Sequence, residues 1–158
     1  MEKLVDYLKE TRVKYDLVLK LIDKLPNSRG KALAYTSLQK GRMYLGEVSR
    51  DLGTVYPYEK TKTATTAEGI QKAVDTSSEN PTISGNEIEQ LNKLRDVLQE
   101  GLDSLLKEFF TLVKTRKTTD LKSRFELDAD FAEAYRSIKE SRIWLGVRLG
   151  EIKDQSNG

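Results

Sequence analysis

The chain has 158 residues, of which 37% are apolar and 33% are charged, and its formal net charge is +2 at pH 7. This length allows one domain or two small repeats with a shared core, and it excludes a large multidomain enzyme. The chain contains no cysteine and no histidine. These absences exclude Cys- and His-based nucleophiles, zinc sites built on those ligands and disulfides.

The N-terminal residues, MEKLVDYLKE, alternate charged and apolar side chains, which is not the pattern of a signal peptide. No segment approaches the run of about 20 apolar residues that spans a bilayer. We therefore predict a cytoplasmic protein without membrane contact.

Residues 3–25 carry apolar side chains at helical spacing and predict a first helix. The following stretch, LPNSRGK at 25–31, contains Pro, Asn, Ser and Gly, which end a helix and begin a turn. A second helix is predicted from residue 31 to residue 52. Together they predict a first antiparallel hairpin at 1–53.

Residues 54–85 are rich in Thr, Ser, Pro and Gly and predict a linker, with room for one short helix at 67–75. Helical periodicity resumes at Asn86, a predicted N-cap with Glu89 three residues later. Residues 86–158 therefore predict a second hairpin.

We place the start of the last helix at Asp130, with Glu133 completing the capping pattern, and its end near Lys153. The basic, Thr-rich stretch at 114–125 is then a connection between the two helices of the second hairpin.

The second helices of the two hairpins contain related sequences, AYTSLQKGRMYLG at 34–46 and AYRSIKESRIWLG at 134–146. Six of the thirteen positions are identical, and their shared place indicates a duplicated unit. One stripe of each helix alternates small and large residues around Gly41 and Ser141, which predicts close helix packing. We expect an all-α fold in which two tandem antiparallel helical hairpins form a pseudo-twofold bundle.

The adjacent stripe of each copy combines an aromatic side chain, a polar side chain and an arginine. These residues are Tyr35, Gln39 and Arg42 in the first copy and Tyr135, Lys139 and Arg142 in the second. Such a group can stack a planar base and bind a phosphate. It also fits a tyrosine at the edge of the core with an arginine extended over it.

Basic residues precede the repeated helices: Arg29 and Lys31 in the first hairpin, Lys122 and Arg124 in the second. Near a helix N-terminus they would favour an anion, although ordinary surface charge explains them as well. The excess of positive charge around these residues is too small to imply binding to duplex nucleic acid.

The stretch SRGKALAYTSLQKGRMYLG, at 28–46, resembles the helical hairpin of phage anti-CBASS proteins, which are cyclic-oligonucleotide sponges related to those that act against Thoeris signalling. Residues 86–109 and 123–146 are similar to the two helices of the same hairpin. The resemblance implies a homo-oligomer that binds a cyclic di- or trinucleotide, or a cyclic ADP-ribose-type ligand, without hydrolysing it. For a phage protein the compartment would be the host bacterium's cytoplasm, where sequestration blocks anti-phage signalling.

Carried over onto this chain, the resemblance implies ligand contacts from both hairpins. The implied residues are Arg29, Thr36, Gln39 and Arg42 in the first and Arg124, Arg136, Lys139 and Arg142 in the second. Lys31, Tyr35, Tyr135 and Trp144 join them as candidates for phosphate and base contacts. Because Thr36 is replaced by Arg136 in the second copy, two equal pockets are not expected.

No catalytic residue, metal or cofactor is predicted, so we expect a binding protein and not an enzyme. The alternative is a structural or adaptor protein whose paired helices bind another protein. A ligand pocket would bury Arg42 and Arg142 around an anion, whereas an adaptor would leave them on a rim.

Overall fold

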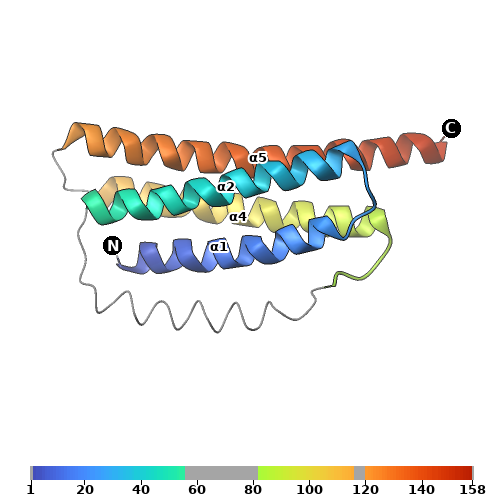
Figure 1. Ribbon diagram of the computed structural model, residues 1–158, viewed down its shortest axis with the longest axis horizontal. Coiled ribbons are helices and arrows are strands. Elements are labelled where there is room, and N and C mark those ends of the chain that lie inside the picture. Colours follow the sequence, from blue (N-terminus) through green and yellow to red (C-terminus); the bar gives the residue numbers. More distant parts are fainter. Residues whose placement is uncertain (1, 56–81, 116–119, 158) are drawn as a thin grey trace.

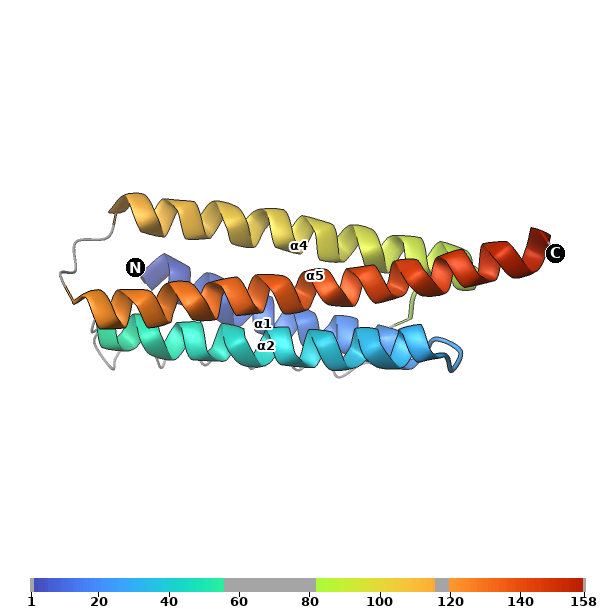
Figure 2. The same cartoon turned by 90° about the horizontal axis from the view of Figure 1, so that it is seen from above.

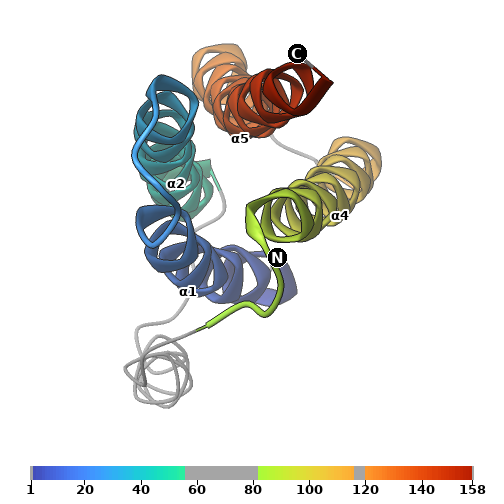
Figure 3. The ribbon, with the colours of Figure 1, turned by 90° about the vertical axis from the view of Figure 1, so that its right-hand side faces the viewer.

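The computed structural model describes residues 2–55, 82–115 and 120–157, and within them every regular element is an α-helix. The helices are α1 (Glu2–Asp23), α2 (Arg29–Val55), α4 (Glu87–Thr115) and α5 (Leu121–Asn157), which run along one long axis (Figure 1). Viewed from one end, they surround a common core (Figure 3). The predicted all-α bundle of two hairpins is confirmed. The predicted short helix at 67–75 lies outside the described residues.

Side-chain caps fix two of the helix starts. The Ser28 Oγ atom accepts a hydrogen bond of 3.0 Å from the backbone N–H of Lys31 at the start of α2. The Asn86 Oδ1 atom accepts one of 2.9 Å from the N–H of Glu89 at the start of α4. Both contacts satisfy an N–H group that the first helical turn leaves without a partner, and the predicted cap at Asn86 is confirmed.

The predicted start of the last helix was wrong, because α5 begins at Leu121 and Asp130 lies well inside it. Asp120 is the cap: its Oδ2 atom accepts a 2.7 Å hydrogen bond from the Ser123 hydroxyl, and its Oδ1 atom lies 3.4 Å from the Ser123 N–H. These contacts hold the pKa of Asp120 below its ordinary value. The helical turns between Leu121 and Asp130, which the sequence analysis did not predict, are stabilised because Leu127 is buried in the core.

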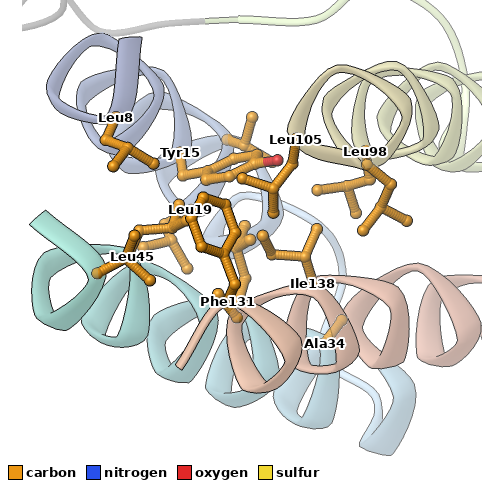
Figure 4. Packing of buried hydrophobic residues seen from close by; sticks show 14 of the residues in the cluster. Leu8, Tyr15, Leu19, Ala34, Leu45, Leu98, Leu105, Phe131 and Ile138 are labelled. Atoms are coloured by element: carbon orange, nitrogen blue, oxygen red, sulfur yellow. The ribbon is translucent and has the colours of Figure 1, made fainter. Parts of the chain in front are cut away.

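The core lies between the four helices and consists mainly of leucine side chains. Figure 4 shows Tyr15 of α1, Leu45 of α2, Leu105 of α4 and Ile138 of α5 pointing into this shared space. All four side chains are at most 1% exposed. The two hairpins therefore share one core.

The two second helices, α2 and α5, make the most extensive contact in the bundle and lie side by side (Figure 2). They cross at the small residues of the repeated sequences. A Cβ atom on Gly41 would lie 2.8 Å from Cγ1 of Ile138 and 3.4 Å from the carbonyl oxygen of Ala134. At the symmetric place, the buried Ser141 hydroxyl donates a 2.7 Å hydrogen bond to the carbonyl of Ala34.

The contact of Gly41 with the Ala134 carbonyl and that of Ser141 with the Ala34 carbonyl are equivalent in the two copies, so a pseudo-twofold axis passes between α2 and α5. The burial of the side chains follows the same symmetry. At each of the thirteen paired positions of 34–46 and 134–146, both residues are buried, both are half-buried or both are exposed. The duplication therefore preserves the packing role of every position in the repeat.

We predict that Gly41→Ala destabilises the protein, because its methyl group would force apart the α2 and α5 backbones; overpacking of this kind costs about 1–3 kcal/mol. Gly150→Ala is the matched control, since nothing lies within 4 Å of the added Cβ atom on the same helix pair. That control should gain up to about 1 kcal/mol from helix propensity. Equal unfolding free energies for the two variants in urea would contradict the close crossing.

Candidate functional site

Arg42 of α2, a predicted phosphate ligand, is paired with a carboxylate of the protein itself. Its Nη2 atom donates a 3.0 Å hydrogen bond to Oδ2 of Asp16 on α1. Its Nε atom lies 2.5 Å from Oδ1 of Asp16, at an angle that makes no hydrogen bond. Both side chains are about one-third exposed. The guanidinium group of Arg42 is thus paired with a carboxylate of α1, and its contact with a phosphate stays a prediction.

Lys31, a second predicted ligand residue, links the two helices of the first hairpin. Its Nζ atom donates 2.7 Å hydrogen bonds to the carbonyl oxygens of Asp23 and Leu25 and a 3.1 Å bond to Oδ1 of Asn27. The ammonium group thereby satisfies carbonyl groups at the C-terminal end of α1. These contacts give Lys31 a structural role.

Arg29 and Trp144, predicted separately, meet at one end of the bundle. The Arg29 Cζ atom lies 5.7 Å from the centre of the Trp144 ring, within cation–π range. Arg29 is exposed and Trp144 is half-buried. The pair therefore presents a cation and an aromatic surface from α2 and α5.

A cleft of about 210 Å³ lies between α4 and α5 and contains two further predicted residues, Tyr135 and Arg136. Its walls are mostly apolar, and Phe109 and Phe131 contribute aromatic rings whose centres are 4.9 Å apart. Asp128 is the acidic residue of the lining. The cleft thus combines aromatic surface with one cation and one carboxylate.

The other predicted residues do not converge on this cleft. Thr36, Gln39 and Lys139 are exposed, and the Thr36 hydroxyl donates a 3.0 Å hydrogen bond to the carbonyl of Ala32 on its own helix. Tyr35 is half-buried and packs against the core. Arg124 lies in the first turn of α5, so its predicted place in a turn before the helix was wrong, while its ligand contact stays a prediction.

Two arginines of the first helices were missed by the sequence analysis. Arg12 of α1 lies against Gly46, and Arg95 of α4 lies against Gly146. Burial, and then the charge of Arg42, lowers the pKa of Arg12. An offset of 83 aligns Arg12 with Arg95, but only Leu8, Arg12 and Leu19 of residues 2–23 are identical to their counterparts, so the sequence carried little signal for this pair.

No protein family, curated protein or solved structure that was compared matches the chain. None of the helices in the described ranges is long and apolar enough to cross a membrane. No group of three or more acidic side chains placed to hold a metal ion occurs in the same ranges.

A carboxyl pair joins α2 and α5 at the end of the bundle opposite Trp144. Burial raises the pKa of Asp51 to about 7, and neighbouring Asp130 adds to the shift, followed by Glu47 and Glu126. The Oδ2 atom of Asp51 is buried and has no hydrogen-bond donor among the described residues. A proton shared with Asp130 would satisfy that atom.

We predict that Asp51→Asn stabilises the protein at pH 8 and that the gain shrinks toward pH 5. The pKa of Asp51 in the folded state lies above its unfolded value, so the stability that its protonation contributes is present at low pH and is lost as the pH rises through about 7. The urea midpoint at pH 5, 6, 7 and 8 measures this difference, with Asp96→Asn on the exposed side of α4 as control. A gain independent of pH would contradict the proposed protonation.

Proposed function

We propose that the chain binds and sequesters a cyclic-oligonucleotide ligand without hydrolysing it. The observation that supports this most is the α4–α5 cleft, where three aromatic side chains and Arg136 come together. Nucleobases stack on aromatic side chains, and phosphates bind arginine through charge-assisted hydrogen bonds. A ligand with both groups matches that combination.

Retention of the ligand is favoured over its hydrolysis by the groups that line the cleft. Phosphodiester hydrolysis needs an activated nucleophile and proton transfer, commonly from histidine or a metal-bound water. The chain has no histidine, and Asp128 is the carboxylate that the cleft offers. We therefore propose a sponge and not a phosphodiesterase.

The cleft is large enough to hold only part of a cyclic oligonucleotide. Its volume of about 210 Å³ lies below the roughly 300–1,000 Å³ of pockets that enclose a drug-sized molecule, so it suits one base. Exposed apolar side chains border the same end of α4 and α5, including Phe110 at 54% and Phe125 at 74% exposure. We propose that a second copy of the chain covers them and completes the binding site.

The same apolar surface supports an adaptor as the second candidate function. Phe110, Leu121 and Phe125 are exposed together where α4 ends and α5 begins, and a different protein could bind them by helix packing. An adaptor of this kind would not respond to cyclic nucleotides. The two proposals are thus separated by a ligand assay.

We predict that a member of a panel of cyclic di- and trinucleotides and cyclic ADP-ribose isomers raises the thermal midpoint of the wild-type protein. Ligand at 1,000 times its dissociation constant stabilises the folded state by about 4 kcal/mol. Arg136→Thr, which installs the residue of the first copy, should weaken binding about tenfold in isothermal titration. Arg50→Ala, whose side chain is 78% exposed on α2, is the control.

Mass spectrometry of the ligand released by heating should recover it intact. Recovery of a linearised product would contradict sequestration and indicate that the protein hydrolyses its ligand. If no ligand of the panel shifts the midpoint, the adaptor becomes the better proposal.

A further inference from the structure

The two hairpins carry matching arginine pairs. In the first, the Arg12 guanidinium lies 3.3 Å from the place that a Cβ atom on Gly46 would occupy. In the second, the Arg95 guanidinium lies 3.4 Å from the corresponding place on Gly146. Both glycines therefore let an arginine of the first helix lie flat on the second helix.

A second arginine stands one helical turn before each glycine. These are Arg42 before Gly46 and Arg142 before Gly146, and residues four apart share a helix face. In the first hairpin the two guanidinium groups are close enough that the charge of Arg42 lowers the pKa of Arg12. In the second hairpin Arg95 lies against Gly146, and Arg142 stands one turn before that glycine, so the symmetry of the two hairpins implies the same arrangement of Arg95 and Arg142.

The hairpins differ in the group that neutralises the pair. Asp16, four residues after Arg12, provides the carboxylate of the first hairpin. Gln99, four residues after Arg95, takes its place in the second. The Gln99 amide donates a 2.9 Å hydrogen bond to Oδ1 of Asp103 on its own helix, so it is engaged along α4.

Among the described residues, Arg95 and Arg142 have no counterpart of the Asp16 carboxylate. Within residues 2–55, 82–115 and 120–157, no ion pair joins either arginine to an acidic side chain. The Nε atoms of both are buried and have no hydrogen-bond acceptor in these same ranges. The Nε atom of Arg12 also lacks an acceptor, so the difference between the hairpins is the missing carboxylate.

We propose that Arg95 and Arg142 form a binding site for a phosphate group, which occupies the position that Asp16 fills in the first hairpin. A guanidinium group binds phosphate through two parallel N–H donors, and two such groups from different helices can clamp one oxyanion. A phosphate that carries up to two negative charges neutralises both arginines, whereas a carboxylate neutralises one. The site is separate from the aromatic cleft and does not require the ligand to be a cyclic nucleotide.

The proposal is tested by exchanging Asp16 and Gln99 through mutation and by measuring the binding of inorganic phosphate. Thermal midpoints are compared in phosphate, acetate and chloride at equal ionic strength for the wild type, Gln99→Asp, Asp16→Gln and the double exchange. The arginine Nε–H resonances in ¹⁵N NMR spectra report which hairpin binds the ion. Arg50→Ala again controls for general charge effects.

We expect phosphate to raise the wild-type midpoint more than acetate does and to shift the Arg95 and Arg142 resonances. Gln99→Asp should raise the midpoint without phosphate and weaken phosphate binding about tenfold or more, because the new carboxylate competes for the same donors. The double exchange should move the phosphate response to Arg12 and Arg42. A wild-type protein that does not distinguish phosphate from chloride, or a Gln99→Asp variant that binds phosphate as the wild type does, would overturn the proposal.

Discussion

The close approach of the α2 and α5 backbones is the contact on which the rest of the structure depends. A Cβ atom on Gly41 would touch Ile138, and one on Gly30 would lie 2.9 Å from Cβ of Arg148. Small residues at these points set both the distance and the antiparallel register of the two helices. Because α1 and α4 pack beside them, this register also decides which side chains of the two hairpins meet.

Duplication has preserved this packing while the polar groups around it have changed. The thirteen paired positions of the repeat keep the same burial, yet Gly41 is replaced by Ser141 and Thr36 by Arg136. Asp16 and Gln99 show the same divergence between the first helices. A shared core with different polar surfaces would allow the hairpins to take on different ligands, and both sites that we propose use residues of the second hairpin.

The fold could be predicted because its signals are local and periodic. The alternation of small and large residues around Gly41 and Ser141 indicated the helix crossing, and Asn86 marked the start of α4. The start of α5 was misplaced because Asp120 and Asp130 are both good caps by sequence. Burial of Leu127, a tertiary contact, decides in favour of Asp120.

The contacts of the candidate binding residues were harder to predict, because the partner of a charged side chain lies far away in the sequence. The pattern around Arg42 does not show that Asp16, on another helix, occupies its guanidinium. Lys31 was likewise assigned to a ligand, although the carbonyl groups at the end of α1 bind it. The pairing of Arg29 with Trp144 depends on the antiparallel register of α2 and α5, which neither residue specifies alone.

The register of α2 against α5 can be measured most directly by cross-linking, since the chain has no cysteine of its own. Cysteines introduced by Gly30→Cys and Arg148→Cys would need to move apart by roughly 1 Å to reach disulfide geometry, and the same movement would relieve the 2.9 Å approach of a Gly30 Cβ atom to the Trp144 carbonyl oxygen. The account predicts that mild oxidation links them within one chain, as seen by mass spectrometry and by mobility without reductant. Gly30→Cys with Gly150→Cys, where nothing approaches the second position, should link much less. Equal cross-linking of the two pairs in folded protein would contradict the crossing.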